Sequence, residues 1–190
     1  FKEHKMSRLP EVDIENLNPD QEAFRDQIVA SPRGELRGPF VPLLHHPAVG
    51  NLIQKVGAQL RFEGVLAGNL RELAIIITAR HWTAQYEWHA HRRIGEKEGI
   101  SPHICDAIAE RREPAFDNEQ EKLVYKFVTG MLANDLRTPD HVFSEALREF
   151  GPNGVIELNC LCGFYGLIGS VLNNFDVEIP DGNDKTPLPA

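Results

Sequence analysis

Apolar residues recur at helical spacing along most of the chain, and this pattern sets the expected fold. From Pro47 to Phe62 the apolar side chains lie three and four residues apart, at Val49, Leu52, Ile53, Val56 and Leu60. Ile75 to Ile77 would also suit a buried strand, but Glu72 and Arg80 flank them and no turn signal closes a strand, so a helix is favoured. No alternating segment of useful strand length is present. The sequence therefore predicts an all-α protein.

Start and stop signals divide this pattern into separate helices. Asn18-Pro19 begins a helix that reaches about Ala30, and two further helices are expected from a cap at Asn69 to about Trp82 and from Thr83 to Glu98. Ser101-Pro102 opens the next helix, and Asp117 with Gln120 resembles a capping box for one through Leu132. Thr138-Pro139 starts a helix that Gly151 stops, and a last apolar helix runs from Gly154 to Phe175.

A chain of 190 residues fits a single domain. We expect an N-terminal arm over residues 1–18, a helical domain over 19–179, and a tail over 180–190 that is flexible or draped over a neighbour. Residues 31–42 contain three prolines and two glycines and are predicted to form a long loop.

Composition narrows the class of protein. The 28 acidic residues exceed the 20 Lys and Arg residues, which gives a formal charge of −8 and argues against nucleic acid as a partner. The apolar runs are shorter than the roughly 18–20 residues that span a bilayer, and no signal peptide is visible, so no membrane partner is expected. Three cysteines form no disulfide framework, which favours a cytoplasmic location.

The residues that could carry chemistry are concentrated between positions 80 and 93. Glu87 and His91 are four residues apart and therefore share one face of a helix. A carboxylate beside an imidazole orients the ring and prepares it for general acid or base work. An antiparallel helix pair could bring Glu72 towards them. The alternative is an ordinary ion pair on a helix surface.

This region also carries a resemblance. The stretch from Arg71-Glu72-Leu73 to Tyr86-Glu87-Trp88-His89-Ala90-His91 resembles the carboxymuconolactone decarboxylase family, whose members share the all-helical alkylhydroperoxidase D fold. The resemblance extends from Gly38-Pro39-Phe40 and His46-Pro47 to the helix that holds Glu157, Leu158 and Tyr165. In the peroxidase branch a Glu, a Cys-x-x-Cys and a His form the site. On this chain the Glu and the His fall on Glu72 and His91, while the cysteine positions fall on Ala84 and Glu87.

The missing dithiol points to the decarboxylase branch of that family. The resemblance implies cofactor-independent decarboxylation and proton transfer on a small lactone, unsaturated or keto carboxylic acid, in the breakdown of aromatic compounds. Glu72, Glu87 and His91 are then the catalytic residues, with His91 as the acid or base, Glu87 as its orienting partner and Glu72 as a second proton carrier. Arg33 and Arg37 in the long loop are candidates to bind the substrate carboxylate.

Other interpretations stay open. Tyr86 is a candidate for substrate binding, although packing would also explain it. The cysteines, Cys105, Cys160 and Cys162, are expected to be small core residues, and an alkylhydroperoxidase-like antioxidant protein that uses Cys160 or Cys162 is the alternative enzyme. A member of the fold that binds a small ligand without turnover is a third possibility. The identity of the substrate is left open.

Two further expectations concern metals and assembly. His81, His89 and His91 do not share one helix face, so no metal site is predicted on a single helix, although two helices could build one. The segment from Val155 to Phe175 is apolar on more than one face, which favours burial against another subunit. The resemblance implies a trimer or hexamer, so we expect a homo-oligomer.

Overall fold

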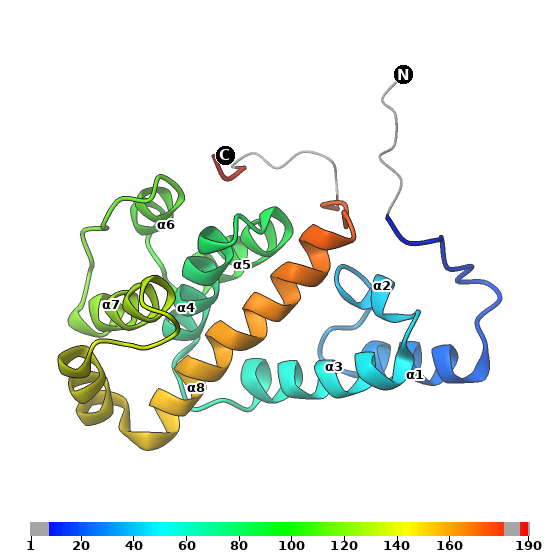
Figure 1. The fold of residues 1–190 in the computed structure, drawn as a ribbon, viewed down its shortest axis with the longest axis horizontal. Helices are drawn as coiled ribbons and strands as arrows, with labels where there is room; N and C mark the ends of the chain where they lie inside the picture. The colour runs from blue at the N-terminus through cyan, green and yellow to red at the C-terminus, as the bar shows by residue number, and fades with distance from the viewer. Residues whose placement is uncertain (1–7, 181–186, 190) are drawn as a thin grey trace.

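The computed structural model describes residues 8–180 and 187–189, and within this part all the regular secondary structure is helical (Figure 1). The elements in chain order are α1 (Pro19–Ala30), α2 (Phe40–Leu43), α3 (Pro47–Phe62), α4 (Gly68–His81), α5 (Gln85–Lys97), α6 (Pro102–Ala109), α7 (Glu119–Ala133) and α8 (Asp140–Asn174). The all-α prediction is confirmed.

Helix α4 forms the centre of the molecule. Every residue from Glu72 to Arg80 is buried, including Ile75 to Ile77, so these isoleucines belong to a core helix and not to a strand. Helices α5, α7 and α8 pack around it, and their fully buried side chains Trp88, Phe127 and Leu158 fill the main core. A smaller core around Phe24, Ile28 and Leu44 joins α1 and α2. It lies at the end of the molecule to which α3 extends (Figure 1).

The helix starts follow the sequence signals at some positions and depart from them at others. Asn18 caps α1 in a reciprocal capping box with Gln21. The cap of α7 is Asn118, which accepts the backbone N–H of Glu121, so the prediction that Asp117 begins this helix is wrong by one residue. The prediction of Asn69 as a cap is also wrong. Helix α4 begins after Ala67, and the Asn69 side chain instead donates a hydrogen bond of 3.1 Å to Glu121.

The two helices predicted on either side of Gly151 are joined into α8 across a kink. Gly151 has a φ of 65°, a left-handed conformation that glycine adopts without strain, and Pro152 follows it. By length and mean hydropathy α8 could cross a membrane, although its uninterrupted apolar runs are shorter than a membrane span. Half of its most apolar window is buried inside the fold, however, which is typical of a core helix.

The ends of the chain lie partly outside the described residues. Residues 1–7 of the predicted arm and residues 181–186 and 190 of the predicted tail are among those outside. Residues 8–18 precede α1 without forming a helix. Leu188 is buried against the main core, and the Gln85 side chain binds both its carbonyl oxygen and its N–H, at 2.8 and 2.9 Å. This part of the tail is therefore held against the start of α5.

Candidate active site

His91 lies between two buried carboxylates. Its Nδ1 is 2.6 Å from Oε2 of Glu72, and its Nε2 is 3.3 Å from Oε2 of Glu87. Glu72 comes from α4 and the other two residues from neighbouring turns of α5, and the close packing of these helices brings the three side chains together. Each of the three is at most 5% exposed. The sequence-based expectation that they converge therefore corresponds to the geometry.

The two carboxylates have opposite electrostatic properties. Burial by itself would raise the pKa of Glu72, but the charge and hydrogen bond of His91 and the charge of Arg61 hold this pKa below its ordinary value. Arg71 acts in the same direction, with its Nε 3.4 Å from Oε1 of Glu72. Burial raises the pKa of Glu87, and the opposing influence of His91 and Arg61 does not cancel it. Glu72 is therefore ionised at neutral pH and fixes the Nδ1–H tautomer of His91, whereas Glu87 retains its proton to a higher pH.

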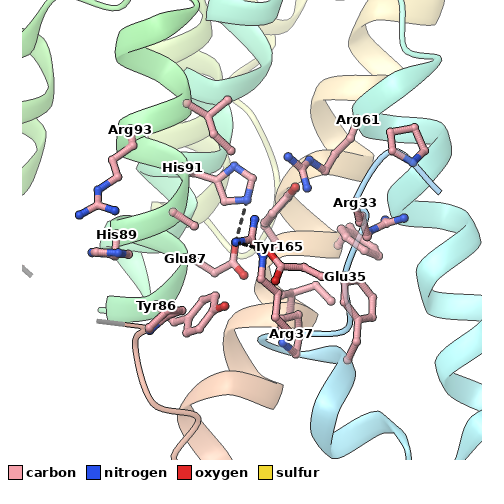
Figure 2. Close-up of a pocket in the computed structure, with 18 of the residues that line it drawn as sticks. Arg33, Glu35, Arg37, Arg61, Tyr86, Glu87, His89, His91, Arg93 and Tyr165 are labelled. Carbon is pink, nitrogen blue, oxygen red and sulfur yellow. Dashed lines mark ion pairs between the residues drawn. The ribbon is translucent and has the colours of Figure 1, made fainter. Parts of the chain in front are cut away.

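A cavity of about 360 Å³ opens next to this group (Figure 2). Glu87 and His91 lie on its wall, while Glu72 is not among the lining residues and supports His91 from behind. The buried Oε2 atom of Glu87 makes no hydrogen bond to the described residues. Apart from the contact with His91, its capacity to form a hydrogen bond is therefore unused.

Arginines face Glu87 and His91 across the cavity (Figure 2). Arg33 lies over the rings of Phe40 and Phe62, at 4.9 and 5.5 Å, and its Nη2 donates to the carbonyl oxygen of Gln54. Its Nη1 is buried and without a hydrogen bond to the described residues. Burial and the neighbouring charge of Arg61 lower the pKa of Arg33, so an anion between the two guanidinium groups would relieve their repulsion.

The other predicted arginine is placed differently. Arg37 also lines the cavity, but its side chain is 63% exposed and paired with Glu35 at 2.8 Å. Exposed pairs of this kind contribute little binding or stability. Arg37 therefore lies at the mouth of the cavity, and Arg33 is the better placed of the two for a carboxylate.

Two tyrosines complete the wall. Tyr86 lines the cavity and packs on Ile168 and Leu172, so both its predicted contact with the site and its packing role are visible. The loop approaches it closely at Gly38, where a Cβ atom would lie 2.7 Å from the tyrosine hydroxyl. Tyr165 of α8 contacts the edge of the His91 ring, with 4.9 Å between ring centroids. Burial raises the pKa of Tyr165, so its hydroxyl remains a neutral hydrogen-bond donor.

Arg61 and Tyr165 are the site residues that sequence reasoning missed as functional groups. Arg61 lies in the last turn of α3. A basic residue is common there because its positive charge interacts favourably with the negative end of the helix dipole. Tyr165 lies in an apolar helix in which an aromatic residue is ordinary core material. Neither position carries a signal that reasoning from spacing could have used.

The cysteines lie away from the cavity. Cys105 and Cys162 are buried, and burial raises the pKa of each thiol to about 12. Cys160 is exposed on α8 and lines a different depression, beside Phe143 and Ile156. None of the three lines the cavity of His91. A thiol with a raised pKa is a poor nucleophile, so this placement gives no support to dithiol chemistry.

The histidines are likewise distributed over different surroundings. His91 is occupied by the two carboxylates, His89 lines the same cavity, and His81 lines another one at the end of α4. Across residues 8–180 and 187–189, no three His, Cys, Asp or Glu side chains are grouped to hold a metal ion.

Comparisons with known proteins agree on the fold. One similar structure is the alkylhydroperoxidase AhpD core of an uncharacterised peroxidase-related protein from Ralstonia eutropha JMP134, with a TM-score of 0.76 and 21% identity over 94% of each chain. Another is a protein of unknown function from Agrobacterium tumefaciens, named as a candidate antioxidant defence protein AhpD, with a TM-score of 0.65 and 13% identity over 76% of this chain and 99% of that one. No family model and no curated protein matches the sequence.

The class of protein follows from these observations. The chain has the all-helical alkylhydroperoxidase D-like fold, which confirms the fold expected from the resemblance. Within this fold, it places a Glu–His–Glu group at a cavity with arginines on the opposite wall.

Proposed function

We propose that the protein is a cofactor-independent enzyme that decarboxylates a small carboxylic acid, of the lactone, unsaturated or keto type, and protonates the product. The observation that carries this proposal is His91, which lies 2.6 Å from Glu72 and 3.3 Å from Glu87 on the wall of a cavity whose other side presents Arg33 and Arg61. The fold itself is compatible with several activities and carries no weight here.

The reaction needs three things that these residues can supply. Arg33 and Arg61 bind the substrate anion and orient it. When the carbon–carbon bond to the carboxylate breaks, carbon dioxide leaves and the electron pair moves into the unsaturated or carbonyl system of the substrate. The Tyr165 hydroxyl is a candidate to donate a hydrogen bond to the oxygen that gains charge. The proton of Glu87 then reaches carbon, either directly or by way of Nε2 of His91, and solvent restores it.

Protein groups alone can carry out this reaction when the substrate contains its own electron sink. Glu72 does not reach the cavity and acts through His91, whose tautomer it fixes. Glu72 is therefore a positioning residue and not the second proton carrier that the resemblance implies.

The proposal is tested by turnover on a panel of β-keto, β,γ-unsaturated and lactone carboxylic acids. Carbon dioxide release is followed together with deuterium incorporation at carbon in heavy water. The His91→Asn and Glu87→Gln variants should lose both signals, while Arg148→Gln, an exposed charge change on α8, should keep them. No turnover on any member of the panel, or turnover that survives His91→Asn, would contradict the proposal.

The alternative function is that of an alkylhydroperoxidase-like antioxidant protein. The names of both structural neighbours favour it. The positions of the cysteines do not, because no thiol faces the cavity. Peroxide consumption that disappears when Cys160 is replaced by Ser would establish this alternative. Binding of the acids without turnover of acids or peroxide would instead indicate a ligand-binding protein.

A homo-oligomer, a trimer or hexamer, belongs to the same proposal. Ile156 and Leu167 of α8 remain 62% and 42% exposed, and Leu52 of α3 is 67% exposed, so apolar surface is left uncovered. Such surface is typical of contacts between subunits. Light scattering that gives a mass near 21 kDa would contradict it. A cytoplasmic location, a small carboxylic acid as the main partner, and the absence of nucleic-acid or membrane partners complete the proposal.

A further inference from the structure

A second cavity, of about 200 Å³, lies between α4, α6 and α7 and shares no lining residue with the first. It is at the C-terminal end of α4, whereas Glu72 lies in the first half of that helix. One part of its wall is apolar and is formed by Ile77, Ile108 and Leu132. The other part carries Arg80, His81, Arg111 and Arg112. A small cavity with an apolar half and a cationic half can hold a small amphipathic anion.

Arg80 and Arg111 have no carboxylate partner in the described part of the chain. Arg80 is only 5% exposed; its Nε donates to the carbonyl oxygen of Ala109 at 2.8 Å, and its Nη1 donates to Oγ1 of Thr83 at 3.1 Å. Arg111 donates to the same oxygen at 3.5 Å, so the two guanidinium groups meet at one hydroxyl. Arg112 differs, because Glu110 neutralises it at 2.6 Å.

The electrostatics show the same imbalance. Burial and the charge of Arg111 lower the pKa of Arg80. Burial and Arg111 also lower the pKa of His81. The positive charge of Arg111 therefore acts unfavourably on Arg80 and His81. A buried guanidinium group is ordinarily paired with an anion instead.

The backbone brings these cations together at two helix ends. After α4, the N–H of Thr83 bonds to the carbonyl of Arg80 and that of Ala84 to Ala79. After α6, Arg111 and Arg112 make the corresponding bonds to Ile108 and Ala107. This arrangement requires a left-handed residue, usually glycine, but here the residues are Thr83 and Arg111, with φ of 48° and 58°. Glycine would adopt this conformation with less strain. The sequence nevertheless has Thr83 and Arg111 at these two positions, and their side chains contact each other.

The negative ends of the two helix dipoles do not fully balance the positive charges of Arg80 and Arg111. Each C-terminus carries about half an elementary negative charge, so two of them offset about one of the two guanidinium charges. The remaining positive charge faces the cavity.

We propose that this cavity is a second binding site, separate from the catalytic one, for a small molecule that carries a phosphate group on an apolar or aromatic body. A phosphate suits the two guanidinium groups because it presents three acceptor oxygens and up to two charges. Ile77, Ile108, Leu132 and the ring of Tyr125 accommodate the body. This inference does not depend on the decarboxylation reaction.

The test is calorimetric titration of the full chain with phenyl phosphate and with inorganic phosphate. We expect saturable binding of both, tighter for phenyl phosphate, because the apolar wall adds contact. Arg111→Gln should weaken binding at least tenfold. Arg148→Gln, which removes the same charge from an exposed position on α8, should leave it unchanged.

A second pair of measurements separates this site from the catalytic cavity and from a structural role. Arg61→Gln removes an anion-binding group of the first cavity, and it should leave the binding event that Arg111→Gln weakens in place; if Arg61→Gln abolishes all phosphate binding while Arg111→Gln does not weaken it, the anion occupies the first cavity and the proposal is wrong. In phosphate-free buffer, Arg111→Gln should unfold at the same temperature or a higher one, because a like charge is removed. A lower unfolding temperature with unchanged phosphate affinity would show that Arg111 only stabilises the helix end. Absence of saturable binding to the wild-type chain would also overturn the proposal.

Discussion

Glu157 and the pair formed by Glu72 and Glu87 are buried glutamates in two different surroundings. Glu157 of α8 accepts backbone N–H groups of Val65 and Leu66 at 2.6 and 3.3 Å, and so closes the loop between α3 and α4. Glu72 and Glu87 share a single imidazole, and one oxygen of Glu87 makes no hydrogen bond to the described residues. All three carboxylates are less than 9% exposed.

The difference shows that burial of a carboxylate does not by itself mark a functional site. Glu157 is satisfied by fixed backbone donors and does not line the cavity of His91. Glu87 has a titratable partner, a raised pKa and access to the cavity. A carboxylate in the first situation stabilises the fold, and one in the second can exchange protons with a bound molecule.

The largest expected effect follows from removing the imidazole that distinguishes the two groups. The His91→Asn variant should lower turnover by about 10²–10⁴-fold, the usual contribution of a general acid or base. Asn can still accept or donate one hydrogen bond beside Glu72, so the fold should survive, which circular dichroism would verify. Turnover within about threefold of wild type would remove His91 from the chemistry, since this is far below that range.

The same substitution at two glutamates sharpens the comparison. Glu157→Gln should lower the free energy of unfolding by about 1–3 kcal/mol, because charge-assisted hydrogen bonds to two N–H groups are weakened. Its turnover per folded molecule should be unchanged. Glu87→Gln should do the reverse, with lost turnover and no loss of stability at neutral pH. Denaturant unfolding measures the stability of each variant, and an activity assay measures its turnover. If the two variants change in the same way, the distinction between a structural Glu157 and a functional Glu87 is refuted.

The pH dependence of stability separates Glu72 from Glu87. The pKa of Glu72 is lowered by folding, so its contribution to stability is present above the ordinary value of 4.5 and is lost as the pH falls through the folded pKa. The pKa of Glu87 is raised, so its ionisation costs stability as the pH rises above 4.5 towards the folded pKa.

Glu87→Gln should therefore gain stability relative to wild type as the pH is raised above 4.5, by up to about 1.4 kcal/mol for each pH unit between the ordinary and folded pKa values. Glu72→Gln should lose stability over the neutral range, and this loss should disappear in acid. Thermal unfolding of both variants over a pH series measures these slopes. Slopes of the same sign would contradict the opposite shifts.

The smallest effect is expected at the exposed thiol, far from either group of glutamates. Cys160→Ser should change the free energy of unfolding by no more than about 0.5 kcal/mol, as is usual for exposed positions. It should leave decarboxylation unchanged. A substantial loss of activity with retained folding would return attention to thiol chemistry.

Part of the site could be predicted from the sequence because it depends on local geometry. The positions of Glu87 and His91 on one helix face follow from the helical period alone. The same holds for the boundaries of α1 and α3, which proline and apolar spacing define. Glu72 was suggested by a possible antiparallel helix pair and by the resemblance, because no local rule connects it to His91 across 19 residues.

Tertiary structure alone decided which side chains meet across helices. It paired Asn69 with Glu121 where the sequence suggested a helix cap, and it directed Glu157 to a loop where the sequence offered only an apolar helix. It also brought Arg61 and Tyr165 to the cavity of His91.

The physical reason is the range of the interactions involved. Periodicity and capping act within one or two turns of a helix, and they fixed the all-α class of this protein and the Glu87–His91 pair. The opposite pKa shifts of Glu72 and Glu87, and the arginines that face them, depend on burial and on charges carried by α3, α4 and α5 together. Those quantities exist only once the helices have packed, because desolvation and Coulomb interactions are properties of the assembled interior.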